Sequence, residues 1–516
     1  MLFDTKRGIP VVDLFAGPGG LCEGFSSLIS NRVRQFDIRL SIEKDVVAHR
    51  TLSLRALFRS FPIGKIPESY YRYIRGEISR QQFENDPFVN PYVAKAYTEA
   101  RCAELGKDDK TEIDSWIRDS ISGEKNWVLI GGPPCQAYSL AGRSRMRGSN
   151  PATFEADERH FLYREYLRII KDFAPSVFVM ENVKGMLSSQ HAGASIFDRI
   201  ISDLRSPGNG SVYLIRSFVV PGEIQDPSEF VIRSEELGIP QKRHRVILFG
   251  IRSDIADAVP DLFHSPNRFI LKKVPQITAG EVLDGLPALR SKLSSRLGGM
   301  TDSLANWQIA LNNGLGILEK KKSALPVQVI DRAKYAVTKS WAHKSSGSFF
   351  IKSNIPMKGA LASWYLDPKI GGVTLHETRS HMESDLHRYL FASSFAREAK
   401  KSPKLCDFPA ALLPNHNNVG QDSTPFVDRF RVQLRNQPSA TIVSHIAKDG
   451  HYYIHHDPSQ CRSLTVREAA RLQTFPDNYF FEGNKTEQYH QVGNAVPPLL
   501  ARKIGEMVLR LLKSVK

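Results

Sequence analysis

The chain contains little cysteine. Its 516 residues include five, and these lie far apart, at Cys22, Cys102, Cys135, Cys406 and Cys461. Because none belongs to a C-x-x-C pair, the sequence argues against a disulfide framework and against structural zinc, and it indicates a reducing compartment. The chain also lacks an N-terminal apolar signal segment and any long apolar run without charges, so we expect neither secretion nor membrane insertion.

Acidic residues are outnumbered by basic ones. The chain has 54 Asp and Glu but 70 Lys and Arg, which gives a formal charge of +16. This excess favours a polyanionic partner such as nucleic acid, because Lys and Arg that neutralise phosphates release condensed counterions. A basic soluble enzyme would have the same composition, so charge alone leaves both interpretations open. The length and the hydrophobic fraction of 41% predict a globular protein of two or more domains.

The N-terminal half alternates short apolar runs with amphipathic stretches, which is typical of a mostly parallel α/β sheet. Strands are predicted in the segments 9–17, 38–45, 126–132, 175–183 and 244–252. Helices are predicted within 17–29 and over 159–173. Residues 46–125 exceed the connection that a βαβ unit requires, so we predict an insertion there that contains helix.

The sequence pattern changes after about residue 275. Residues 276–460 lose the alternation and are rich in Ser, Asn, Gly, Lys and His, but aromatic residues remain frequent, which argues against disorder. We predict a second, smaller and largely irregular domain there. Helical patterns return in 463–475, with Ser463 or Thr465 as N-cap, and in 497–515, which opens with prolines.

Two turns carry candidate chemistry. DLFAGPGG (13–20) is a glycine turn of the kind that approaches NAD, another nucleotide or S-adenosylmethionine, and the turn alone does not choose among them. Phe15 could pack on an adenine, and Glu43 could accept ribose hydroxyls, although a solvated strand-end acid is the alternative for Glu43. GGPPCQAYS (131–139) places Cys135 behind two stiff prolines, a setting that packing does not require and that favours a presented thiol.

Six sequence blocks then occur in one order: DLFAGPGGL (13–21), GGPPCQAYS (131–139), ENVKGM (181–186), QKRHRV (241–246), RSLTVREAARLQTFPD (462–477) and QVGNAVPP (491–498). Together they resemble the cytosine-C5 DNA methyltransferases. The resemblance covers both ends of the chain and leaves 46–125 and 276–460 without a motif. It implies a Rossmann-like methyltransferase domain, S-adenosylmethionine as methyl donor, and a variable region at 253–461 that reads DNA sequence.

The chemistry of such an enzyme gives the catalytic residues their roles. Cytosine C5 is a poor nucleophile until a thiolate adds to C6. We predict that Cys135 provides this thiolate. Glu181 can donate a proton to N3 if burial holds it protonated. By resemblance, Arg245 contacts O2 of the base, and Arg243 contacts O2, the thiolate or a phosphate. The sequence does not identify the base that removes the C5 proton.

The cofactor-binding residues that the resemblance implies lie in the glycine turn, at the second strand end, in the proline turn and in the last block. They are Phe15, Ala16, Gly17, Pro18, Gly19, Gly20, Glu43, Pro134, Asn494 and Ala495. The acid that meets the adenine amine is left open among Asp109, Glu112 and Asp114. No metal ligand is predicted.

We therefore predict a catalytic domain at 1–275, a target-recognition domain at 276–460 and a segment at 461–516 that completes the catalytic domain. The predicted enzyme acts as a monomer on a cytosine flipped out of duplex DNA. A cognate restriction endonuclease is a candidate partner, and, for a prokaryotic source, the cytoplasm and its nucleoid are the expected location. The alternatives are a transfer-RNA methyltransferase and a catalytically idle DNA-binding protein.

DNA that carries 5-fluorocytosine at the target tests the role of Cys135. Release of the enzyme requires loss of a proton from C5, and fluorine cannot leave as a cation, so the methylated base should stay bonded to the thiol. We expect an adduct that requires S-adenosylmethionine, survives denaturing electrophoresis and yields a cross-linked peptide containing Cys135. Cys135→Ser should form no adduct, because a serine hydroxyl is a weaker nucleophile. Robust methylation by Cys135→Ser would mean that the thiol of Cys135 has only a packing role.

Overall fold

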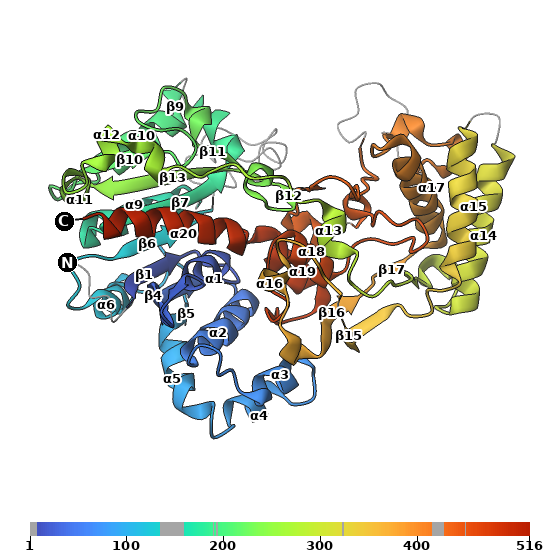
Figure 1. Cartoon of the computed structure of the whole chain (residues 1–516), viewed down its shortest axis with the longest axis horizontal. Helices are drawn as coiled ribbons and strands as arrows, with labels where there is room; N and C mark the ends of the chain where they lie inside the picture. The colour runs from blue at the N-terminus through green and yellow to red at the C-terminus, as the bar shows by residue number, and fades with distance from the viewer. Residues whose placement is uncertain are drawn as a thin grey trace.

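A computed structural model describes residues 8–134, 159–188, 190–191, 194–321, 325–354, 356–414, 428–448 and 450–515. The molecule has two parts (Figure 1). A sheet with helices on both faces forms the part on the left of Figure 1, and three long helices dominate the part on the right. In these ranges no helix has the length and apolarity needed to cross a membrane.

The main sheet has eight strands. In spatial order seven of them are β10 (Tyr213–Arg216), β13 (His244–Arg252), β7 (Val177–Val183), β6 (Val128–Gly131), β1 (Ile9–Leu14), β4 (Phe36–Glu43) and β5 (Ala100–Cys102), and β11 (Val231–Arg233) also pairs with β13. The strands from β7 to β5 run parallel, whereas β13 is antiparallel to its neighbours. All five predicted strands are confirmed.

The chain order of the strands reverses at β1, which has β4 on one side and β6 on the other. In open α/β sheets, ligands bind outside the carboxyl ends of the strands at such a point. The glycine turn follows β1, and the proline turn follows β6. The topology therefore brings the two candidate turns of the sequence to the same edge of the sheet.

The C-terminal helix returns to the start of the chain. α20 (Pro498–Lys513) packs against α1 (Gly20–Ser26), and both bury apolar side chains in one core with β1 and β13. Gly24 permits the close approach, because a Cβ there would lie 2.4 Å from the Cβ of Ala501. The opposite face of the sheet is covered by α6 (Lys110–Ile121), α9 (Arg159–Phe173) and α10 (Ile196–Arg205).

Residues 46–125 contribute to both parts of the molecule. They form α2 (Val46–Ser60), α3 (Glu68–Ile74), α4 (Arg80–Glu84), α5 (Asn90–Glu99), β5 and α6. Because β5 belongs to the main sheet, the insertion covers fewer residues than the predicted range 46–125. The hydroxyl of Tyr71 donates to Asp367 Oδ2 at 2.9 Å, and that of Tyr73 donates to Glu482 Oε1 at 2.5 Å. The α3 segment thus supports the C-terminal segment and the second part.

The second part has a core of its own. α14 (Leu304–Lys320), α15 (Val327–Ser340) and α17 (Glu383–Ala399) pack around buried side chains that include Trp307, Leu311 and Phe391. Much of the remainder is irregular, as expected, apart from the pair β15 (Gly347–Lys352) and β16 (Gly372–Glu377). The three helices were not predicted, because residues 276–460 are rich in polar residues.

The helix α18 (Val466–Leu472) lies where the two parts meet. Of the two predicted N-caps, the structure selects Thr465, whose hydroxyl accepts from the main-chain N–H of Glu468 at 3.2 Å. All seven helical residues are buried, including Arg467 and Arg471. The helix therefore packs the two parts together, and its charged side is buried along with its apolar side.

Two glycine substitutions distinguish the effect of close helix packing on stability from the effect of helix propensity. Gly24→Ala should destabilise the protein by roughly 1–3 kcal/mol, because the new methyl group overlaps Ala501 and the Pro498 carbonyl. Gly316→Ala, within α14 and with no atom within 4 Å of the added Cβ, should stabilise by about 0.5–1 kcal/mol. Urea unfolding measures both changes, and equal effects would contradict the close helix packing.

Candidate active site

The glycine turn has an unusual backbone. Phe15, Gly17 and Gly19 have φ angles of 58°, 56° and 93°, in the left-handed region. A non-glycine residue is seldom held there except at functional sites and tight turns. A Cβ added at Gly17 would meet no atom within 4 Å, whereas one at Gly19 would lie 2.9 Å from Leu52 Cδ1. The space above Gly17 is therefore open, and Gly19 serves packing.

Glu43 lies beside this turn, as the sequence predicted for the end of the second strand. Its Oε2 accepts from the main-chain N–H of Gly17 at 2.7 Å, and its Oε1 accepts from that of Asp45 at 2.8 Å. Burial raises the pKa of this half-buried carboxyl group. The carboxylate thus ties the turn to β4 and retains lone pairs for a further donor.

The last sequence block also reaches the glycine turn. Asn494 ends α19 (Lys485–Asn494), and Ala495 follows as its C-cap. The next residue touches the turn, because a Cβ at Gly20 would lie 2.2 Å from the carbonyl oxygen of Val496. The Asn494 side chain is exposed. The structure thus places both predicted residues next to the turn, although they are almost 500 residues from it in sequence.

A second group of side chains lies at the ends of β7 and β13. Arg245 Nε is 3.0 Å from Glu181 Oε1, and each side chain is 14% exposed. This contact is an ion pair without hydrogen-bond geometry, so Oε1 is buried with no hydrogen-bond partner in the described ranges. Such an atom has capacity for a ligand that donates a hydrogen bond.

The proline turn is attached to the same place. Asn182 Nδ2 donates to the carbonyl oxygen of Pro133 at 3.3 Å, so the Asn182 side chain holds the main chain of the proline turn. A Cβ at Gly132 would lie 3.3 Å from Glu181 Oε2. Cys135 lies outside the described residues. Gly132, whose added Cβ would approach Glu181, lies three residues before Cys135 in sequence.

Arg243 has structural partners. Its guanidinium is buried and donates from Nη1 to the carbonyl oxygens of Ile442 at 2.9 Å and Gly493 at 3.3 Å. Burial, reinforced by the neighbouring Arg245, lowers the pKa of Arg243 to about 9, so the group stays cationic at neutral pH. These bonds join β13 to the second part and to the last block, and they do not include Glu181.

The candidates for the adenine contact separate in the structure. Asp109 caps α6 by accepting from Thr111 N at 2.8 Å, and Asp114 accepts from Arg168 Nη1 at 2.9 Å. Glu112 is exposed on α6. Sequence reasoning missed Glu104, which lies two residues after β5. The main-chain N–H of the preceding Ala103 donates to the carbonyl oxygen of Glu43 at 3.1 Å, and the Glu104 carboxylate pairs with Lys44 at 3.0 Å. The three-residue strand β5 was too short to be recognised, so the acid after it had no strand end to mark it.

Comparison with known proteins agrees with this geometry. A family model described as C-5 cytosine-specific DNA methylase matches residues 82–510. The chain belongs to this family. It is 31% identical to the type II methyltransferase M.Bpa9945I of Bacillus paralicheniformis, over 96% of this chain and 98% of the relative. It is 26% identical to the DNA (cytosine-5-)-methyltransferase M.ApeKI of Aeropyrum pernix, over 77% and 83%.

The fold of this cytosine-5 methyltransferase is also that of a solved structure. A crystal structure described as a DNA modification methyltransferase encoded within a prophage (E. coli) superposes with a TM-score of 0.55 at 18% identity, covering 98% of this chain and 100% of the other. The predicted family and the Rossmann-like fold class are confirmed. The chain is an enzyme that methylates C5 of cytosine in DNA, and its family and fold imply S-adenosylmethionine as methyl donor.

Substitution of Gly17 tests the cofactor site. Gly17→Ala should weaken S-adenosylmethionine binding at least tenfold in calorimetry, because the new methyl group enters the open space above the turn. Gly64→Ala is the matched control, since Gly64 also has a left-handed φ (+79°) and open space around its Cβ. Both variants should lose about 1–2 kcal/mol of stability through backbone strain. Equal cofactor affinity in both would contradict the site.

Proposed function

We propose that this methyltransferase acts on one cytosine flipped out of a specific duplex sequence, with Cys135 as nucleophile and with Glu181 and Arg245 contacting the base. The observation that carries the proposal is the Arg245–Glu181 pair beside the proline turn. A target base has to leave the duplex to reach such a site, because C5 is stacked inside the helix.

The glycine turn is the proposed cofactor site. When bound, S-adenosylmethionine supplies an electrophilic methyl group. The open space above Gly17 and the carboxylate of Glu43 suit a ribose, and Phe15 suits an adenine face. Ala16, Pro18, Gly19, Gly20, Pro134, Asn494 and Ala495 complete the proposed lining. For the adenine amine we favour Glu104, because it follows the residue that is hydrogen-bonded to Glu43 and because its carboxylate pairs with the exposed Lys44 and Lys107, whereas Asp109 caps α6 and Asp114 is held by Arg168.

The proposed reaction begins at the base. The Cys135 thiolate forms a bond to C6, the C5–C6 electron pair moves toward C4 and N3, and N3 takes a proton from Glu181. C5 of the resulting enamine then bonds to the methyl carbon, whose bond to the donor sulfonium breaks and leaves a neutral thioether. A water molecule takes the C5 proton, the C5–C6 double bond is restored, the S–C6 bond breaks to release the Cys135 thiolate, and the N3 proton returns to Glu181. Arg245 donates to O2, where negative charge develops.

Arg243 has a different task in this scheme. Its bonds to the carbonyls of Ile442 and Gly493 support a positioning role, in which it fixes the strand that carries Arg245. The earlier expectation of a contact with O2, the thiolate or a phosphate has no such support. We propose that Arg243 acts on catalysis only through the placement of Arg245.

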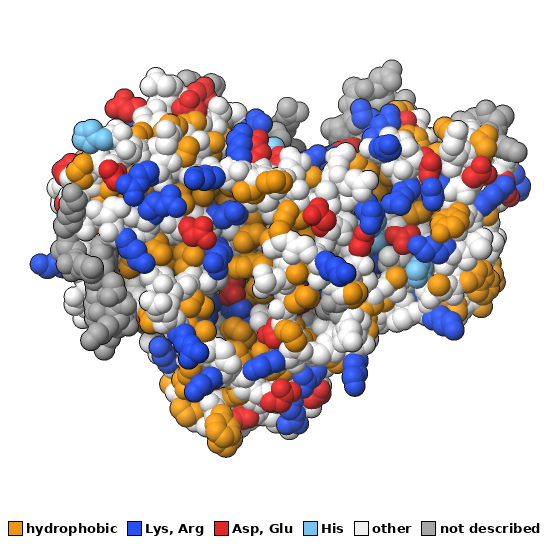
Figure 2. Space-filling model, viewed as in Figure 1, with side chains coloured by type: hydrophobic (Ala, Val, Ile, Leu, Met, Phe, Trp, Pro, Cys, Tyr) orange, Lys and Arg blue, Asp and Glu red, His pale blue; other side chains and the backbone are white. Residues whose placement is uncertain are grey.

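The DNA partner is supported by charge. Lys and Arg side chains are spread over both parts of the face in Figure 2, which suits contacts with a phosphate backbone.

We propose that residues 276–460 choose the sequence, that the enzyme acts as a monomer in the cytoplasm, and that a cognate restriction endonuclease accompanies it. The type II names of the relatives support the last point.

Bisulfite sequencing of DNA from cells that express the chain tests the proposed function. Methylated cytosines should occur in one short duplex motif and should be absent from cells that express Cys135→Ser. Dispersed methylation would contradict sequence choice. Methylation of transfer RNA without any of DNA would contradict the substrate.

Glu181→Gln tests the proton donor. The amide cannot deliver a proton to N3, so the methylation rate on a target duplex should fall by about 10²–10⁴-fold. Glu319→Gln, an equivalent change at an exposed position on α14, should leave the rate unchanged. A normal rate with Glu181→Gln, in a protein with unchanged cofactor affinity, would remove Glu181 from the mechanism.

A further inference from the structure

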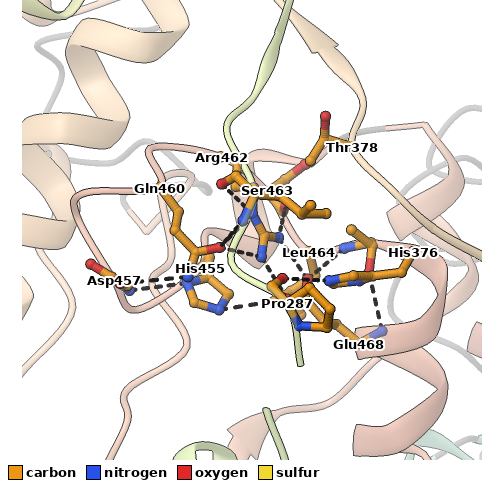
Figure 3. Close-up of polar contacts among 12 residues, drawn as sticks. Pro287, His376, Thr378, His455, Asp457, Gln460, Arg462, Ser463, Leu464 and Glu468 are labelled. Atoms are coloured by element: carbon orange, nitrogen blue, oxygen red, sulfur yellow. Dashed lines mark hydrogen bonds and ion pairs between the residues drawn. The ribbon is translucent and has the colours of Figure 1, made fainter. Parts of the chain in front are cut away.

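A cavity of about 460 Å³ lies where the two parts meet, apart from the active site. Its walls come from the segment 283–288, from one side of α15, from the end of α17 and from residues 455–462 ahead of α18. Figure 3 shows several wall residues, with His455, Asp457, Gln460 and Arg462 linked by polar contacts. None of the proposed catalytic or cofactor residues lines it.

The carboxylates of the wall already have partners in the wall itself. The pairs are Glu468 with Arg462 at 2.7 Å, Asp284 with Arg435 at 2.6 Å, and Asp457 with the Ser459 hydroxyl at 2.7 Å. The buried pair is fully enclosed, since both side chains are 1% exposed. Glu468 and Asp284 therefore neutralise two arginines of the wall, whereas Asp457 is bonded to a neutral hydroxyl and remains a negative group.

Three further cations line the cavity. Arg332 pairs with Glu398, which lies outside the lining, and Lys339 reaches only to 4.0 Å from Asp457. Arg397 has no ion pair or hydrogen bond with any residue in the described ranges. The cavity thus has an excess of positive charge, and an anion would gain from entering it.

One buried nitrogen of the wall lacks a partner. His456 is 7% exposed, and its Nε2 lies 2.9 Å from Asp284 Oδ1. The hydrogen-bond partners of Asp284 outweigh its burial and lower its pKa, so this group is an acceptor and the histidine proton sits on Nε2. Nδ1 then has no hydrogen-bond partner among the residues that the structure describes. A buried polar atom in this state indicates a missing ligand or solvent molecule.

We propose that this cavity binds a phosphate group. A phosphate offers oxygens to Arg397, Lys339 and Arg332, and its P–OH can donate to Nδ1 of His456. A fully ionised phosphate has no P–OH group, so it accepts a hydrogen bond from Nδ1 when the His456 ring carries a proton there. An apolar ligand would leave these cations and the ring nitrogen unsatisfied, and a metal ion would be repelled by them.

Two sources can supply this phosphate. One is the backbone of the DNA substrate, an assignment that rests on the proposed function. The other is a free phosphate-bearing small molecule, which does not depend on it.

Calorimetric titration of the full chain with inorganic phosphate tests the site. The double variant Lys339→Ala, Arg397→Ala should bind phosphate at least tenfold more weakly than the native protein, and both substitutions are at exposed positions. The matched control is Lys334→Ala, Lys401→Ala, whose side chains lie on or near the same helices outside the lining. The absence of phosphate binding by the native protein, or equal binding by both double variants, would overturn the proposal.

A second measurement distinguishes the sources. If DNA backbone occupies the cavity, phosphate should compete with a non-target duplex, and the double variant should reduce the slope of log affinity against log salt by about 1–2. If the slope is unchanged while phosphate binding is lost, the ligand is a free phosphate compound. Methylation of a target duplex by the native enzyme is read separately, so loss of that activity would concern the proposed function and not the cavity.

Discussion

The arrangement of the two parts depends on three guanidinium groups that have almost no contact with solvent. Arg462 is 1% exposed, and Arg467 and Arg471 are 0% exposed. Removing a charge from water costs several kcal/mol, so a group of this kind is tolerated only when carboxylates and carbonyls surround it. Each one binds acceptors from distant segments: Glu468 and Leu289 O for Arg462, Thr374, Pro476 O and Tyr479 O for Arg467, and Asp477 and Val282 O for Arg471. The two parts cannot separate without exposing unpaired partners.

The same buried layer extends to the catalytic strands. Gln473, just after α18, is hydrogen-bonded to Gln241 at 2.5 Å and to the carbonyl oxygen of Val492 at 2.6 Å. Gln241 begins β12 (Gln241–Lys242), two residues before Arg243, which in turn binds Gly493. A set of polar contacts therefore runs from the junction of the two parts to Arg243, two residues before Arg245 in sequence. The start of the strand that carries Arg245 is thus held by the same buried layer that joins the two parts.

The sequence predicted the sheet because its five predicted strands are largely buried. A strand covered on both faces is a continuous apolar run, and the five long runs were each visible between turns. The glycine and proline turns were also visible, since the backbone angles that they need restrict residue type. Shorter or more polar elements were not. β5 has three residues, and α14 is interrupted by Asn312-Asn313-Gly314 and by Gly316, which disfavour a helix, so neither has a local pattern strong enough to identify it.

By itself, then, the sequence determined the family, the α/β sheet, the two turns and the candidate residues, because each depends on residue type and local spacing. The tertiary structure alone decided which of these residues meet. It joined Glu43 to Gly17 and Glu181 to Arg245, and it directed Arg243 to main-chain carbonyls. It also buried the charged side of α18 at the junction of the two parts. Burial and hydrogen-bond partners depend on segments hundreds of residues apart, and no local pattern contains them.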